Sequence, residues 1–305
     1  PAVAPHGALK SLFGTNPICF GTPTGSKIPF ILDTSISMIN RGKIRVAARN
    51  NQKIPEGVAL AKFGKPTQNA TKTGIGMVAV KNSGHYGLSG YYAEQAVKKN
   101  LVTMIYTSAP PAVAPHGALK SLFGTNPICF GTPTGSKIPF ILDTSISMIN
   151  RGKIRVAARN NQKIPEGVAL DKFGKPTTDA KKALKGVQLP IAGFRGSGLA
   201  WMVDILSGVL TGSNHAGRVK DPFDDFSGPQ NIGHLFITFK TNLFVKDYNS
   251  RIKNNIKTIK KLPKIKGVKN IMYPGENKFK RFKMNSKKDI KISETIKKDL
   301  KILKN

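Results

Sequence analysis

The sequence predicts an α/β protein in which strands and helices alternate. GMVAVK at 76–81 and LVTMIYT at 101–107 are apolar, β-branched runs typical of buried strands, and residues 89–99 between them have the spacing of a helix. No G-x-G-x-x-G opens a helix after a strand, and no G-x-x-x-x-G-K-[ST] occurs. The expected class is therefore α/β without a Rossmann fingerprint or a P-loop.

The later segments continue this alternation. FGTNPICF at 123–130 is followed by a predicted strand that ends in ILDTS at 141–145, and then by a polar, turn-rich region at 158–186. LAWMVDILSGVLTG at 199–212 predicts an apolar helix, and HLFITF at 234–239 predicts a late strand. In the tail, two prolines bracket a predicted loop and an apolar stripe predicts a further helix; these residues are Pro263 and Pro274, then Ile292, Ile296, Leu300 and Leu303.

An internal duplication dominates the first half of the chain. Residues 1–67 match residues 111–177 at every position except Ala61, which corresponds to Asp171. Solenoid repeats diverge on their surfaces and need three or more copies, so this block is interpreted as an extra copy. We therefore predict three parts: the copy at 1–67, a nucleotide-binding part at 70–240 and a basic helical segment at 241–305.

Composition limits the class of protein. The cysteines, Cys19 and Cys129, are the same position in the two copies, so a disulfide framework is not expected. No apolar run reaches the length of a membrane span, and the N-terminus has no signal pattern. We expect a soluble cytoplasmic protein with no membrane association.

The formal net charge of +33 raises the question of nucleic-acid binding. Residues 240–305 contain 21 lysines and arginines against five acidic residues. However, no zinc-finger spacing, Gly-X-X-Gly clamp or aromatic RNA-binding motif accompanies the charge. A solvated, lysine-rich surface is the favoured interpretation, and a nucleic-acid surface is the alternative.

His85 is the candidate for proton transfer. It lies in SGHYG directly after a predicted strand, and Gly84 and Gly87 leave room for a ligand beside the imidazole. Histidine exchanges a proton near neutral pH, as the interconversion of an alcohol and a ketone requires. The alternative is a loop histidine bonded to backbone. The other histidines are weaker candidates, and no metal site is predicted because metal-ligand spacings are missing.

Two segments are candidates for binding a phosphorylated cofactor. GFRGSG at 193–198 precedes the apolar helix, where backbone N–H groups and Arg195 favour an anion. A glycine-rich helix entry explains this segment equally well. In ILDTS, Asp143, Thr144 and Ser145 could bind ribose hydroxyls or could cap a helix.

Many blocks together resemble the type-2 malate/L-lactate dehydrogenase family. The resemblance covers residues 70–305, and its blocks occur in the family's order and spacing. They are SGHYGLSGYYAEQA, TSAPPAVAPHG, LFGTNPICF, ILDTSISMINRGKI, IPEGVALDKFGKPTTDA, LPIAGFRGSGLAWMVDILSGVLTG, PFDDFSGPQNIGHLFI and YPGE. The family includes malate, lactate, sulfolactate and ureidoglycolate dehydrogenases, which use NAD or NADP.

The resemblance implies a fold, a reaction and a set of site residues. The fold is a largely antiparallel sheet flanked by helices, and two subunits pair as a homodimer. His85 corresponds to the catalytic acid/base histidine. The cofactor contacts correspond to Ser108 and Ala109, to Asp143, Thr144 and Ser145, and to Arg195 with Gly196. Arg195 replaces the usual lysine, which keeps the charge but changes its reach.

The sequence departs from the family before residue 70. Family members carry an Asp-Ser-His-Gly segment there, followed by an arginine and a tyrosine that help hold the substrate carboxylate, and nothing here matches it. We therefore expect an NAD(P)-dependent dehydrogenase of a 2-hydroxy acid such as malate or lactate, with low activity in this chain. The alternatives are a non-catalytic remnant that binds dinucleotide and a basic nucleic-acid-binding protein.

Salt dependence separates the two interpretations of the basic tail. If its lysines only solvate a surface, random duplex DNA should bind weakly and should dissociate near physiological salt. Fluorescence anisotropy over a salt series measures this. Sub-micromolar, sequence-dependent binding at physiological salt would contradict the prediction.

Overall fold

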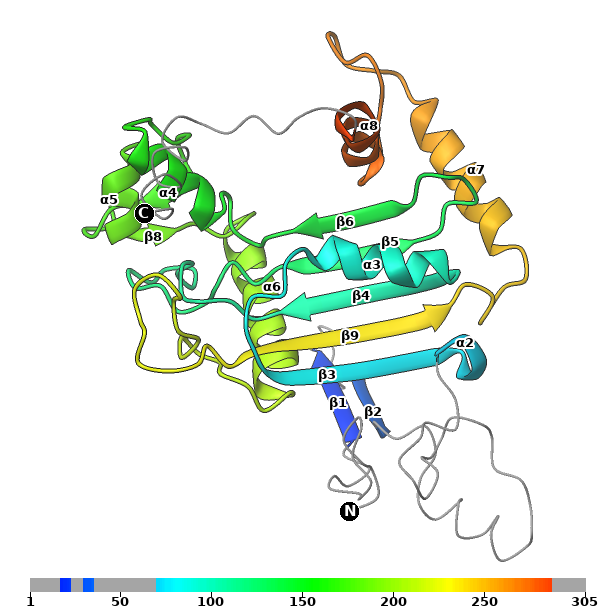
Figure 1. The fold of residues 1–305 in the computed structure, drawn as a ribbon, viewed down its shortest axis with the longest axis horizontal. Coiled ribbons are helices and arrows are strands. Elements are labelled where there is room, and N and C mark those ends of the chain that lie inside the picture. The colour runs from blue at the N-terminus through cyan, green and yellow to red at the C-terminus, as the bar shows by residue number, and fades with distance from the viewer. Residues whose placement is uncertain (1–16, 23–29, 36–69, 287–305) are drawn as a thin grey trace, which may run out of the picture.

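The centre of the molecule is a five-stranded antiparallel sheet. The computed structural model describes residues 17–22, 30–35 and 70–286 (Figure 1). The strand order is β3-β9-β4-β5-β6, and every neighbouring pair is antiparallel. The strands are β3 (Ile75–Ser83), β4 (Leu101–Thr107), β5 (Ile128–Thr132), β6 (Phe140–Thr144) and β9 (Ile232–Lys240). The expected α/β class with a largely antiparallel sheet is confirmed.

The first predicted unit forms as expected. The short helix α2 (Ala70–Thr73) leads into β3, and α3 (Ser89–Lys98) lies between β3 and β4. α3 packs on one face of the sheet through a core of Ala93, Ile105 and Cys129, whose side chains are 0–1% exposed. Burial raises the pKa of the Cys129 thiol to about 12, so this cysteine behaves as a small apolar core residue.

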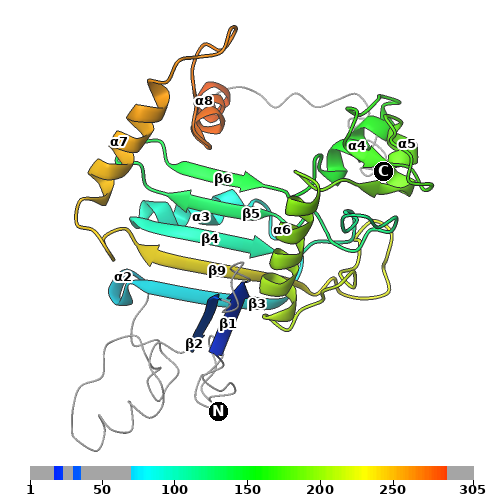
Figure 2. The same ribbon diagram turned by 180° about the vertical axis from the view of Figure 1, so that it is seen from behind.

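Helix α6 covers part of the opposite face of the sheet. It spans Phe194–Asp204 and continues as a π-helical turn, η1, over Ile205–Val209, so it begins five residues before the predicted 199. Figures 1 and 2 show α3 on one side of the sheet and α6 crossing the strands on the other. η1 approaches β9 closely because residue 233 is glycine: a Cβ there would lie 1.6 Å from the Ser207 carbonyl oxygen.

A small lobe follows β6. It contains α4 (Arg151–Arg159), α5 (Ala180–Lys185) and the strand pair β7 (Ala169–Leu170) and β8 (Val187–Gln188). Side chains of Asn150 and Asp179 accept backbone N–H bonds at the starts of α4 and α5. The predicted turn-rich region thus contains short elements with a core of their own, which includes Ile154, Ile164 and Val168.

The basic tail contributes two helices. α7 spans Tyr248–Lys260 and α8 spans Glu276–Asn285, and the loop bracketed by the two prolines separates them as predicted. Tyr248 bonds Thr132 of β5 at 2.6 Å, and Lys260 bonds Glu276 at 2.7 Å, so both helices are tied down. The apolar stripe predicted for residues 292–303 lies outside the described residues. Among the described helices, none is long and apolar enough to cross a membrane.

The two copies of the repeat have different positions in the fold. β1 (Pro17–Thr22) and β2 (Phe30–Ser35) form a separate two-stranded sheet, in which residue 18 faces residue 34. In the second copy the equivalent residues, 128 and 144, face each other within the main sheet. The main sheet therefore takes β5 and β6 from residues 111–177, while the first copy repeats their pairing elsewhere.

This arrangement predicts the effect of removing the first copy. Deletion of residues 1–67 should leave the melting temperature of the remainder unchanged or higher, because β5 and β6 already fill their places in the sheet. Differential scanning calorimetry of the full chain and of the deletion variant measures the difference. A melting temperature lowered by more than a few degrees would contradict the extra-copy interpretation.

Candidate functional site

A cavity of about 650 Å³ lies at one edge of the main sheet. Because neighbouring strands run in opposite directions, this edge collects the ends of β3, β4 and β6 and the starts of β5 and β9. Its polar and charged lining residues are His85, Tyr86, Ser89, Thr107, Ser108, Thr125, Asp143, Ser145, Asn150, Arg151, Arg155, Asp221, Gln230, His234 and Lys278.

His85 lies in the loop that joins β3 to α3, and it is exposed to the cavity. Its Nδ1 accepts a hydrogen bond from the Gly87 N–H at 3.1 Å. This contact favours the neutral tautomer that carries its proton on Nε2, so the Nε2 edge is free for a ligand oxygen. The predicted alternative, a histidine bonded to its own loop, therefore holds for Nδ1 and leaves the other nitrogen available.

A buried polar chain lies beside His85. Tyr86 Oη is 2.6 Å from Ser89 Oγ and 2.8 Å from Thr107 Oγ1, which is 3.1 Å from His234 Nδ1. The rings of Tyr86 and His234 are in contact, with centroids 4.1 Å apart. Burial raises the pKa of Tyr86, so its hydroxyl stays protonated at neutral pH.

His234 is a buried neutral histidine. Its side chain is 2% exposed and its Nε2 makes no well-formed hydrogen bond with the described residues. Burial lowers its pKa to about 4; a backbone contact with Gly84 opposes this shift, and the nearby His85 adds to it. The unpaired nitrogen belongs to a residue that lines the cavity, so His234 is a candidate ligand contact that sequence reasoning ranked too low.

Four of the predicted cofactor residues meet at this cavity. Asp143 Oδ2 accepts the Gly90 N–H of the first turn of α3 at 2.8 Å, which fixes one oxygen and leaves Oδ1 without a hydrogen bond to any described residue. Ser145 lies two residues further on. Ser108 pairs with Gly233, and the Ala109 N–H donates to Asn126 Oδ1 at 3.2 Å.

Three of the predicted cofactor residues do not line the cavity. Thr144 alternates with Asp143 along β6, so its side chain points to the opposite face of the sheet. Arg195 is exposed on the first turn of α6. Gly196 packs against Ile191, where a Cβ would lie 1.8 Å from the carbonyl oxygen. The glycine-rich helix entry therefore explains Gly196 by close packing.

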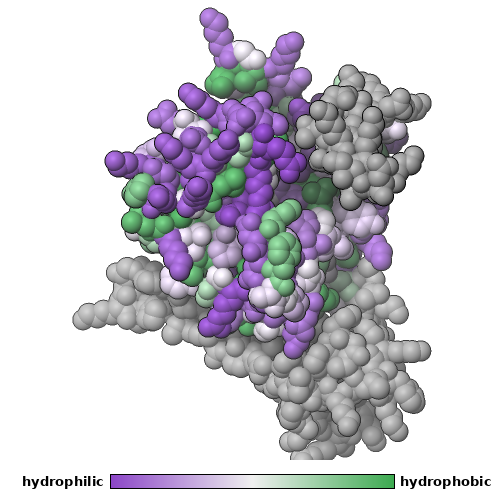
Figure 3. Space-filling view, turned by 60° about the vertical axis from the view of Figure 1, so that its left-hand side comes forward, coloured by the Kyte–Doolittle hydropathy of each residue, from purple (hydrophilic) through white to green (hydrophobic). Residues whose placement is uncertain are grey.

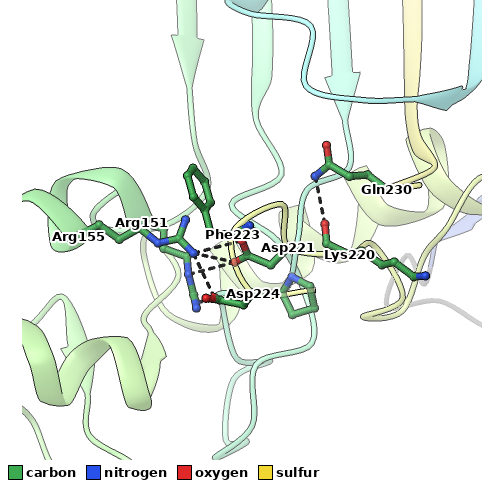
Figure 4. Close-up of polar contacts among 8 residues, drawn as sticks. Arg151, Arg155, Lys220, Asp221, Phe223, Asp224 and Gln230 are labelled. Carbon is green, nitrogen blue, oxygen red and sulfur yellow. Dashed lines mark hydrogen bonds and ion pairs between the residues drawn. The ribbon is translucent and has the colours of Figure 1, made fainter. Parts of the chain in front are cut away.

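An ion cluster closes one wall of the cavity (Figure 4). Arg155 Nη2 donates to both carboxylate oxygens of Asp221, at 3.1 and 2.9 Å, and lies 3.3 Å from Asp224 Oδ2. Its guanidinium also stacks over the Phe223 ring, 4.2 Å from the centroid. This cluster ties α4 to the loop before β9.

Arg151 is less fully paired than Arg155. Its Nε lies 3.6 Å from Asp221 Oδ2 and is buried without a hydrogen bond, and its Nη1 donates to the Pro111 carbonyl at 3.4 Å. The remaining donors suit an anionic ligand. Sequence reasoning missed these arginines because RGKIRVAAR has the pattern of an ordinary basic helix. Among the described residues, no group of three or more His, Cys, Asp or Glu side chains could hold a metal ion.

The fold and the cavity together are those of a non-Rossmann nucleotide-dependent oxidoreductase family. A family model described as malate/L-lactate dehydrogenase matches residues 1–73 and 68–301. The chain belongs to the malate/L-lactate dehydrogenase family, as the motif resemblance predicted.

Individual relatives agree with this assignment. The chain is 34% identical over 236 residues to malate/(S)-sulfolactate dehydrogenase of Methanothermus fervidus, covering 77% of this chain and 68% of that protein. It is 36% identical over 210 residues to (2R)-3-sulfolactate dehydrogenase (NADP(+)) of Chromohalobacter salexigens, covering 68% and 62%.

A solved structure is similar as well. The sulfolactate dehydrogenase of Methanocaldococcus jannaschii superposes with a TM-score of 0.66 at 36% identity, covering 74% of this chain and 66% of that one. The chain thus spans about two thirds of the length of these relatives.

The buried His234 predicts a loss of stability in mild acid. The folded-state pKa of about 4 lies below the ordinary 6.5, so the unfolded state binds more protons between these values. The stabilisation is complete above pH 6.5 and is lost as the pH falls towards 4, by roughly 3 kcal/mol in the free energy of unfolding.

Urea unfolding at pH 7, 6, 5 and 4.5 tests this prediction. The His234→Gln variant should lose less stability over this range than the wild type, because it has no imidazole to protonate. His215→Gln is the matched control, since it leaves His234 in place and should keep the full pH dependence. Equal slopes for wild type and His234→Gln would contradict the prediction.

Proposed function

We propose that this chain is an NAD(P)-dependent oxidoreductase that transfers a hydride between nicotinamide and a 2-hydroxy acid such as malate or lactate. The observation that carries the proposal is the meeting of His85, Ser108, Asp143 and Ser145 at one cavity. Family membership and the names of the relatives, which act on malate or sulfolactate, support the substrate class.

The residues at the cavity fit a dinucleotide. The volume of about 650 Å³ lies in the usual range for small-molecule sites. Oδ1 of Asp143 suits a ribose hydroxyl, and the unpaired donors of Arg151 together with Lys278 suit phosphate oxygens. The nicotinamide, when bound, would accept or supply the hydride. Ser108 and Ala109 form part of the wall between Asp143 and His85.

His85 is the proposed acid/base group. Oxidation of a hydroxyl group requires removal of its proton as the hydride leaves, and the reverse reaction requires that proton back. In either direction one imidazole nitrogen must face the substrate oxygen, and Nε2 is the nitrogen that the Gly87 contact leaves free. Full protonation of the ring would place a proton on Nδ1 and break that contact, so the loop at 84–88 is expected to respond to proton transfer.

Two further site residues are proposed to orient the ligand without exchanging a proton. The neutral His234 and the protonated Tyr86 hydroxyl would supply fixed hydrogen-bonding groups beside His85 at neutral pH. We also expect two copies of the chain to pair, because the sheet leaves an apolar surface that a second copy would cover.

Substitution of His85 tests the proposed reaction. His85→Asn should leave NADH or NADPH binding within about twofold while lowering the turnover of 2-hydroxy acid oxidation by about 10²–10⁴-fold, because only proton transfer is lost. Binding is measured by fluorescence titration and turnover by the absorbance of the reduced cofactor.

His116→Asn is the matched control, because His116 does not line the cavity and its replacement should preserve both quantities. If the wild-type chain binds dinucleotide but oxidises none of malate, lactate and sulfolactate, the non-catalytic alternative is supported. A variant that loses cofactor affinity and turnover in equal measure would contradict the assigned role of His85.

A further inference from the structure

The sheet face opposite α3 carries a row of large apolar side chains. The strand registers pair Met77 with Ile237, Ile237 with Met104, Met104 with Phe130, and Phe130 with Leu142. One apolar side chain from each of the five strands therefore lies on the same line. Met77 is 44% exposed, Leu142 is 39% exposed, and the other three are half-buried. We call these five residues the apolar row.

A helical ridge runs beside this row. α6 covers the neighbouring rung of the sheet, where Tyr106 and Ile128 pack against it, and η1 lies against β9 (Figure 2). The outer side of the helix exposes Trp201, Ile205 and Val209, which are 61%, 46% and 51% accessible and four residues apart. These three residues are the α6 ridge. The ridge and the apolar row both run across the strands, next to each other.

Charge restricts what can cover this surface. None of the eight residues in the apolar row and the α6 ridge is charged, although the chain has a formal net charge of +33. The side of the molecule in Figure 3 is, by contrast, largely hydrophilic. Two copies so strongly positive repel one another wherever their basic surfaces meet, so an uncharged apolar surface is where they can approach. An acidic partner would instead favour the lysine-rich surfaces.

We propose that a second copy of this chain docks on this surface, with the α6 ridge of each copy lying on the apolar row of the other. Such a contact is isologous and closes as a two-fold dimer. This inference is independent of the proposed reaction. The two helices would lie side by side between two facing sheets, in the same layer as each other.

Dimensions support this arrangement. Adjacent helices pack with axes about 8–10 Å apart, and rungs on one face of a sheet are separated by about 6.8 Å, so a helix beside α6 would lie over the apolar row. At about 1.5 Å per residue and 10 Å width, α6 with η1 covers on the order of 240 Å². Two such contacts bury on the order of 500 Å² per copy, near the total of about 1,000 Å² that a specific interface requires.

Trp201 provides a direct measurement, because it is the sole tryptophan of the chain. We expect a dimer at micromolar concentration by analytical ultracentrifugation. On dilution, the dimer should dissociate and Trp201 emission should shift to longer wavelength over the same concentration range.

Two variants test the two halves of the contact. Trp201→Glu and Met77→Glu should each weaken dimerisation by 100-fold or more. Met77→Glu should also give the solvent-exposed emission of Trp201 at all concentrations, because the row of one copy covers the ridge of the other. Phe173→Glu is the matched control: Phe173 is 70% exposed on the small lobe, and its replacement should change neither quantity. Circular dichroism verifies that each variant is folded.

Three outcomes would overturn the proposal. One is a chain that stays monomeric at high concentration, and another is a dimer that persists in both glutamate variants. The third is a buried Trp201 emission that does not change with concentration, because the ridge would then be covered by residues of its own chain.

Discussion

The position of β9 between β3 and β4 is the constraint on which the rest of the structure depends. Both early strands pair antiparallel with β9 and so run parallel to each other. A parallel pair cannot be joined by a tight hairpin, so the chain must cross from the end of β3 to the start of β4, and α3 makes that crossing. The loop that begins the crossing carries His85, which places the imidazole at the edge of the sheet where the cavity lies.

The same strand order brings the other candidate residues to that edge. Strands β4 and β6 end there, which positions Ser108, Asp143 and Ser145, and β9 begins there, which positions His234. The loop before β9 must also reach this edge, and the pairing of Asp221 with Arg155 holds it against α4. Breaking that pair would leave a partly buried charge without its partner, so the wall of the cavity depends on it.

The two faces of the sheet have different surroundings. α3 covers one face over a small core, while α6 covers only one end of the other. The uncovered apolar row is unusual in a chain whose surface is dominated by lysine, since isolated apolar residues are common on surfaces but an ordered row across five strands is not. The large positive charge and the apolar surface thus have opposite effects on self-association, and the geometry of α6 and the row determines where contact is possible.

Local patterns in the sequence were sufficient to predict the order of the central elements and the position of His85. β-branched runs predicted β3, β4 and β9, because burial of a strand requires a continuous apolar stretch, and the glycines around His85 indicated a loop able to hold a ligand. Motif resemblance added the antiparallel sheet. The roles of Arg195 and His234 depended on contacts between distant segments.

Arg195 lies on α6, outside the cavity, and His234 lies inside it because β9 is inserted between two strands that precede it by more than a hundred residues. Strand order and side-chain direction follow from long-range pairing and packing, which residue patterns within one segment do not record. For that reason the sequence by itself determined the elements and the candidate acid/base group, and only the tertiary structure decided which charged and polar side chains share the cavity.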